Sequence, residues 1–308
     1  MKRIILIGAI IVTICLVTFA YLFISEKKET SVIKKEIFRP EDKLIYEQGL
    51  SLAAKGESQK ALDQWQRLAN RFPDSDYIDE ALLKTAEIYL KEGDILKAEK
   101  VYKRIVRDYS NSNSIALAQK ALGQTRIKLL FSSIKTEDSQ IYEVRPGDTL
   151  SSIAAEFNTT VELLKKSNQF SSDLIRPGMK MKVPAVEYSL LVDKSQNTIA
   201  LKSAEEIVQT YLISTGSPIH DTPVGKFKIT TKLVNPSWRG IPPEDPKNIL
   251  GSRWMGFEPP YSEYGIHGTT DPKSIGKNIT QGCIRMSNSD IEELYAIVPI
   301  GSEVTIIE

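Results

Sequence analysis

The chain has 308 residues, a length that favours about two domains and allows more if some of them are small. Its 40 basic and 39 acidic residues give a net charge of +1, which supplies no electrostatic footprint for nucleic acid or for an anionic membrane surface. We therefore expect a multidomain protein that does not bind nucleic acid.

The N-terminal region predicts a transmembrane helix. Lys2 and Arg3 precede 21 uncharged, mostly apolar positions, 4–24, and a helix of that length spans about 30 Å, the thickness of a hydrocarbon core. This run is longer than the apolar part of a usual signal peptide and lacks a cleavage pattern, which favours an uncleaved anchor over a cleaved signal. Residues 1–24 are interpreted as a cytoplasmic tip and anchor, although lysines on both sides leave the orientation ambiguous from charge alone. The charged residues 25–40 are interpreted as a linker.

Residues 41–130 predict an all-α segment of helical repeats. Two stretches, 56–75 and 93–112, align with a constant offset of 37 residues, which pairs Gly56 with Gly93, Ala61 with Ala98, Trp65 with Tyr102 and Phe72 with Tyr109. A turn glycine, a small residue at a helix crossing and a closing aromatic suit stacked helix pairs, and the spacing resembles tetratricopeptide repeats, slightly lengthened. Residues 117–130 predict a capping helix. The repeats could dock a protein partner or act as a spacer, and the sequence favours neither.

After a linker at 131–140, residues 141–185 predict a small βααβ module. Asp148 or Thr149 can cap its first helix and Thr160 its second, and strand-like runs stand at both ends. The pattern from "GDTLSSIA" to "RPGMKMKVP" resembles the LysM module. That resemblance implies binding of glycans that contain N-acetylglucosamine, such as peptidoglycan; a purely structural spacer is the alternative.

Residues 186–308 predict a mostly-β domain, because short alternating runs are broken by turn residues. One helix stands out at 289–298, with Ser289 and Glu292 as its capping box. Cys283 is expected just before this helix, at the end of a strand. The Pro-rich stretch 235–264, which contains Trp254, fits either a lid or a packed loop.

One histidine and one cysteine stand close in sequence, although the chain has only two of each. His267 and Cys283 are 16 residues apart, so two neighbouring strand ends could join them. An imidazole near a free thiol raises the thiolate fraction and shuttles its proton. Either a backbone carbonyl or the side chain of Asp271 could hold the ring. The amides of Gly282 and Cys283 could donate to a developing oxyanion.

The other histidine and the other cysteine receive no catalytic role. Cys15 lies in the apolar run, where a thiol packs as a hydrophobe, so Cys283 is predicted to be free. His220 is expected to face solvent. Two scattered histidines and one cysteine lack a metal-ligand spacing, so neither a metal nor another cofactor is predicted.

From residue 188 onward the motifs "STGSPIHDTPVGKFKI", "SRWMGF", "YGIHGT" and "GCIRMSNSDIEEL" resemble the YkuD-type L,D-transpeptidase catalytic domain. The resemblance implies Cys283 as nucleophile, His267 as general base and acid, and the carbonyl of Gly268 as the group that orients the histidine. It also implies that Arg285 supports the site or holds a substrate carboxylate. Where the family has Ser followed by His, Arg or Lys, this chain has Thr280 and Gln281, which keep the hydroxyl and lack the charge.

Together these features predict a membrane-anchored peptidoglycan L,D-transpeptidase that forms 3-3 crosslinks through a cysteine thioester. The bulk of the chain is expected outside the cell, on the wall side of a single-pass membrane, with LysM on the glycan and the catalytic domain on stem peptides. Two alternatives stay open: an L,D-carboxypeptidase, in which water resolves the thioester, and a non-catalytic wall-binding scaffold that recruits partners through its repeats.

Overall fold

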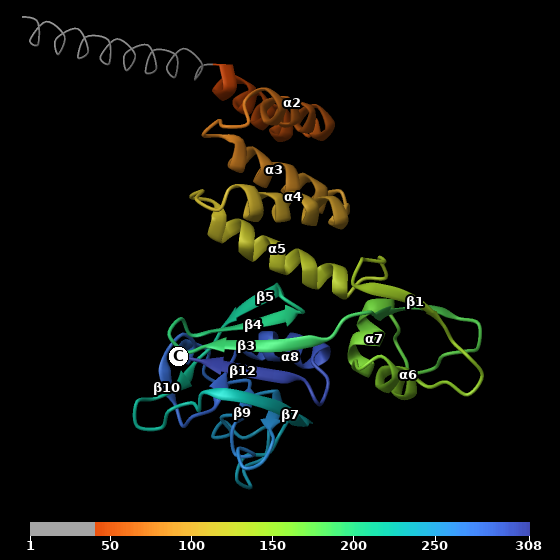
Figure 1. The fold of residues 1–308 in the computed structure, drawn as a ribbon, viewed down its shortest axis with the longest axis vertical. Coiled ribbons are helices and arrows are strands. Elements are labelled where there is room, and N and C mark those ends of the chain that lie inside the picture. Colours follow the sequence, from red (N-terminus) through yellow and green to blue (C-terminus); the bar gives the residue numbers. More distant parts are fainter. Residues whose placement is uncertain (1–40) are drawn as a thin grey trace, which may run out of the picture. The chain divides into compact units, whose positions relative to one another are not determined.

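The computed structural model describes residues 41–308 (Figure 1). The predicted transmembrane helix and the linker that follows it, residues 1–40, lie outside the described residues. Within 41–308 no helix combines the length and the apolar character needed to cross a bilayer. The described chain forms two compact units: residues 41–94 with Arg104–Ile115, and Ile95–Lys103 with Ala116–Glu308.

The first unit is helical, as the repeat pattern predicts. Residues 41–54 are helical and are followed by α2 (Ser58–Arg71), α3 (Ile78–Lys91) and α4 (Ile95–Asp108), of which the last turn belongs to this unit. Trp65 is buried at its centre, and Gly49 allows the helices to approach, because a Cβ there would lie 2.2 Å from Nε1 of Trp65.

A polar contact repeats with the same 37-residue offset. The hydroxyl of Ser75 donates to the Asp42 carboxylate at 2.7 Å, and the hydroxyl of Ser112 donates to the Asp79 carboxylate. Each carboxylate stands near the start of a helix, where an acidic side chain is favoured by the helix dipole. The internal repeat is therefore present in the contacts as well as in the sequence.

The second unit contains the βααβ module. Its elements are β1 (Ser139–Glu143), α6 (Leu150–Glu156), α7 (Val161–Asn168) and β2 (Lys180–Pro184), and β1 pairs antiparallel with β2. Thr149 caps α6, which decides between the two predicted caps, and Thr160 caps α7 as expected. The first strand begins at Ser139, inside the range predicted to be a linker.

The largest part of the second unit is a mostly-β domain, as predicted. Its elements are β3 (Tyr188–Asp193), β4 (Thr198–Ser203), β5 (Glu206–Leu212), β6 (Thr215–Gly216), β7 (Gly225–Val234), β8 (Arg253–Phe257), β9 (Gly265–His267), the 3-10 helix η1 (Pro272–Ser274), β10 (Asn278–Thr280), β11 (Ile284–Arg285), α8 (Asn288–Ile297) and β12 (Glu303–Ile307). Eight strands form one mixed sheet in the order β11-β9-β8-β7-β12-β3-β4-β5, and β6 pairs with β10. The edge strand β11 therefore lies beside β9.

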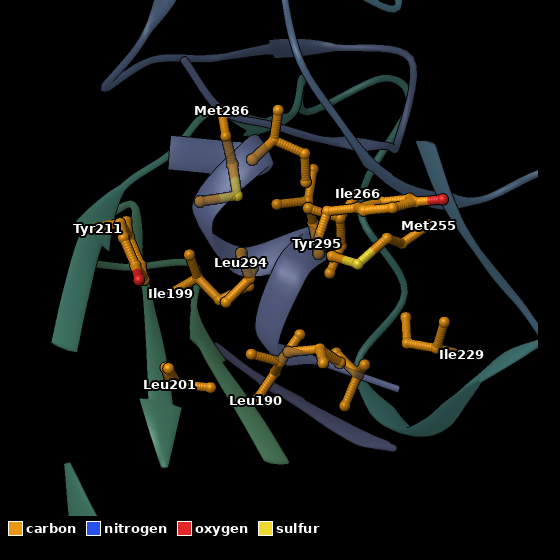
Figure 2. Close-up of a cluster of buried hydrophobic side chains, with 14 of the residues drawn as sticks. Leu190, Ile199, Leu201, Tyr211, Ile229, Met255, Ile266, Met286, Leu294 and Tyr295 are labelled. Carbon is orange, nitrogen blue, oxygen red and sulfur yellow. The ribbon is translucent and has the colours of Figure 1, made fainter. Parts of the chain in front are cut away.

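Helix α8 packs against this sheet and forms the core of the domain (Figure 2). Leu294 from the helix lies in a cluster with Leu190 of β3, Met255 of β8 and Ile266 of β9. The cap of α8 differs from the predicted Ser289–Glu292 box. Ser287 has the extended backbone of an N-cap, and its hydroxyl accepts from the amide of Asp290.

Helix α5 (Ile115–Leu130) contacts the sheet domain. Gly123 lies against the side chain of Gln209, which leaves no room for a Cβ, and Arg126 donates to Glu206 at 2.7 Å. Ile127 joins the buried cluster of the sheet. The helix that the sequence predicts as a cap for the repeats thus packs against the β domain.

Candidate active site

The site is built on two neighbouring parallel strands. β11 pairs with β9, with Ile284 opposite Ile266 and Arg285 opposite His267. Because side chains alternate across a strand and both isoleucines are fully buried in the core, His267 and Arg285 lie on the other face. Cys283 precedes β11 on the same face as Arg285. His267 ends one of two adjacent strands and Cys283 stands immediately before the other, so the cysteine is not at the end of a strand as predicted.

The imidazole of His267 is 2% exposed and contacts a backbone carbonyl. Its Nδ1 lies 2.6 Å from the oxygen of Gly268, so this carbonyl, and not the exposed side chain of Asp271, is the partner of the ring. A carbonyl can only accept, so Nδ1 carries the proton of a neutral ring and Nε2 keeps the lone pair. That tautomer can take a proton from a thiol.

Burial lowers the pKa of His267 to about 4. The positive charge of Arg285 lowers this pKa further, and the carbonyls of Gly268 and Leu250 raise it without reversing the shift. The ring is therefore uncharged at neutral pH.

Cys283 is a free, half-buried thiol whose Sγ lies 3.7 Å from the carbonyl oxygen of Glu263. Burial raises the pKa of this thiol above its usual value, although the amide of Gly265 and the charge of Arg285 both oppose that shift. The resting pair is thus a neutral thiol and a neutral imidazole. This corrects the expected increase in thiolate fraction, because desolvation outweighs the groups that favour the anion.

Thr280 holds the turn that presents Cys283. Its buried hydroxyl donates to the carbonyl of Cys283 at 2.6 Å and accepts from the amide of Gly282 at 3.2 Å. Gly282 has a φ of +100°, and a Cβ there would lie 2.5 Å from the ring of Tyr264. The glycine is required by the turn, but its amide is bound to Thr280. This corrects its expected oxyanion role and leaves the amide of Cys283 as the candidate donor.

Asn288 is a site residue that the sequence reasoning missed. Its Oδ1 accepts from the amides of Ser252 and Thr269 at 3.1 and 3.0 Å. A Cβ on Gly268 would lie 2.2 Å from that oxygen. Asn288 therefore fixes the segment whose carbonyl contacts the histidine ring. Asn288 is the first residue of α8 and belongs to the motif "GCIRMSNSDIEEL", and this position in the motif is the feature of the sequence that could have indicated its role.

Arg285 has spare hydrogen-bonding capacity. Its Nε is buried without a hydrogen-bond partner among the described residues, while the side chain as a whole is half-buried. A guanidinium with an unused donor is suited to a carboxylate. Gln281 and His220 are exposed, as expected for His220. Within residues 41–308 no group of three or more His, Cys, Asp or Glu side chains is arranged to hold a metal ion.

The βααβ module has a shallow pocket of about 510 Å³ lined by residues 141–146, Pro177 and Gly178. The guanidinium of Arg145 lies 5.3 Å from the centre of the Tyr142 ring, and the Tyr142 hydroxyl donates to Asp148 at 2.7 Å. The Tyr142 ring is buried, so the exposed guanidinium of Arg145 is the polar group that this pocket offers to a ligand.

Three family models match separate parts of the chain. The L,D-transpeptidase catalytic domain matches residues 187–306, the LysM domain matches 142–184, and the tetratricopeptide repeat matches 44–75 and 80–112.

Curated relatives match the second half. A putative L,D-transpeptidase YkuD from Bacillus licheniformis is 36% identical over 173 residues, which is 54% of the chain and 98% of that protein. The Bacillus subtilis counterpart is 36% identical over 171 residues, 54% of the chain and 97% of that protein. Among solved structures, an L,D-transpeptidase from Mycobacterium smegmatis aligns with a TM-score of 0.34 at 22% identity, covering 42% of the chain and 64% of that protein.

Proposed function

The chain belongs to the YkuD-type L,D-transpeptidase family, and from this premise we propose that it forms 3-3 crosslinks between peptidoglycan stem peptides. The LysM and tetratricopeptide resemblances are confirmed by their family matches. In the proposed reaction Sγ of Cys283 bonds to the carbonyl carbon of the third residue of a tetrapeptide stem. The peptide bond to D-Ala breaks and a thioester remains. A side-chain amine of a second stem then attacks the thioester and releases the thiol.

The observation that supports this proposal most is the cross-strand register of β9 and β11. His267 and Arg285 are opposite each other in this register, and Cys283 immediately precedes the strand of Arg285, all inside the matched catalytic domain. Because both reacting groups are neutral at rest, we propose that His267 takes the thiol proton as the Sγ–C bond forms and later gives it to the amine of D-Ala.

Two further groups fit the substrate. The backbone amide of Cys283 is a donor for the tetrahedral oxyanion, because the neighbouring amide of Gly282 is already bound to Thr280. The buried Nε of Arg285 has no partner among residues 41–308, and a stem carboxylate would satisfy it.

The decisive experiment incubates the full chain with disaccharide tetrapeptides and follows D-Ala release and product masses. We expect 3-3 dimers and an acyl adduct on Cys283 by intact mass. Cys283→Ala should abolish both, and Cys15→Ala, the matched control at the other cysteine, should keep both. Full turnover by Cys283→Ala would refute the proposal. Tripeptide monomers without dimers would instead mean that water resolves the thioester.

We also propose that the LysM pocket binds the glycan and that the apolar run at 4–24 anchors the chain on the wall side of a membrane. Co-sedimentation with insoluble peptidoglycan tests the first point, with Arg145→Ala at the pocket and Lys202→Ala on β4 as the matched surface control. Equal sedimentation of both variants would exclude this pocket. Protection of the β domain from external protease in spheroplasts would exclude the wall-side location.

A further inference from the structure

Trp254 lies in a row of three side chains that crosses the catalytic face of the sheet. It is opposite His267 in the pairing of β8 with β9, and His267 is opposite Arg285 in the pairing of β9 with β11. The rings of Trp254 and His267 are stacked, with centroids 6.0 Å apart and planes inclined by 22°. The sequence left the stretch around Trp254 open between a lid and a packed loop; the structure places this residue in a central strand.

Two glycines make room for the indole along this row. A Cβ on Gly256 would lie 2.7 Å from Nε1 of Trp254, and a Cβ on Gly265 would lie 2.8 Å from its Cζ2. Both distances are too short for any side chain, so the edge of the indole that carries Nε1 and Cζ2 lies against two positions where only glycine fits. Two neighbouring positions, Gly256 on β8 and Gly265 on β9, therefore leave the space that the indole occupies.

The charged form of His267 is destabilised by its surroundings. The proposed acylation turns a ring that is 2% exposed into an imidazolium, and Arg285, whose positive charge acts on this ring, is opposite it in the pairing of β9 with β11. Burial and like charge both oppose this cation. The other titratable groups around it act more remotely: Asp271 acts on Arg285, and Glu263 acts on the Cys283 thiol. The π face of an indole attracts a cation within about 6 Å of the ring centre.

We propose that Trp254 is a positioning residue that holds the ring of His267 and stabilises its imidazolium form through the π face of the indole. The inference rests on the proposed function. As Sγ of Cys283 bonds to the stem carbonyl, the thiol proton moves to the imidazole, and Trp254 lowers the free energy of that charged ring until the proton passes to the departing amine of D-Ala.

The test replaces Trp254 site-specifically with tryptophans that carry one to four fluorines on the benzo ring. Fluorine weakens the negative π face and leaves shape and burial nearly unchanged. We expect the rate of Cys283 acylation to fall stepwise, to about a tenth for the tetrafluoro variant, which corresponds to about 1.4 kcal/mol. The NMR-measured pKa of His267 should fall in the same order. The same replacements at Trp238 are the matched control and should change neither quantity.

The chain has only two histidines, so the exposed His220 is an internal NMR reference. An acylation rate and a His267 pKa that are both constant across the series would overturn the inference and leave Trp254 as packing. If the unmodified enzyme forms no acyl adduct on Cys283, the proposed function fails instead. The pKa series still decides whether the indole stabilises the imidazolium in that case.

Discussion

Removing the Thr280 hydroxyl should loosen the turn that carries the nucleophile. Thr280→Val keeps the shape of a side chain that is 3% exposed and removes one oxygen. That oxygen makes two bonds, to the carbonyl of Cys283 at 2.6 Å and from the amide of Gly282 at 3.2 Å. Each lost bond costs about 1 kcal/mol, and a backbone group left buried without a partner costs about 1–3 kcal/mol. We therefore expect the free energy of unfolding to fall by about 2–4 kcal/mol.

The same substitution should slow acylation, because the Cys283 amide and Sγ both move with the turn. A misplacement of the order of 1 Å costs about 100-fold in rate. Urea unfolding of the full chain and the rate of D-Ala release measure the two effects. Thr280→Ser is the matched control: it keeps the hydroxyl and loses one methyl, about 1 kcal/mol. If Val and Ser variants prove equal in both measurements, the hydroxyl does not hold the turn.

Three further predictions concern groups around the site and the module. Asn288→Ala leaves two amide donors without an acceptor and should reduce the rate of D-Ala release at least tenfold. Asn288→Asp keeps the acceptor, so its rate should stay closer to that of the parent. An equal loss of rate in both variants would contradict a role for Oδ1. Because the pKa of His267 is about 4 in the folded chain and 6.5 in the reference state, the unfolded chain binds the extra proton between these values. The free energy of unfolding should therefore fall by roughly 3 kcal/mol from pH 7 to pH 4, with no further loss from this group below pH 4. Denaturation curves of His267→Gln should lack this component. Thr160→Val removes the cap of α7 and a bond to the carbonyl of Ala296, so calorimetry should show a loss of about 1–2 kcal/mol that Thr160→Ser avoids.

Local patterns in the sequence were enough for much of the architecture. The βααβ order, the Thr160 cap and the alternating strands depend on residues that are close in the chain, and each of these features is present. The pairing of the strand that ends in His267 with the strand that follows Cys283 could also be predicted, because it needs only two adjacent strands.

What the sequence could not supply depends on long-range pairing and burial. The amide of Gly282 is occupied because the turn brings it to Thr280, which spacing alone does not reveal. The stack of Trp254 on His267 exists only once β8 pairs with β9. The raised pKa of Cys283 reflects desolvation by surrounding elements. None of these follows from a motif.

The short length of β11 restricts where insertions and deletions can occur in related proteins. This strand has two residues, and its alternation sends Ile284 into the core while Arg285 lies on the opposite face. One residue inserted between Cys283 and Ile284 would exchange the faces, burying the guanidinium of Arg285 and exposing an isoleucine beside His267. The connection after Thr269 has no such constraint at its exposed positions. We therefore expect insertions and deletions across homologues to accumulate in that connection and to be absent between Gly282 and Met286.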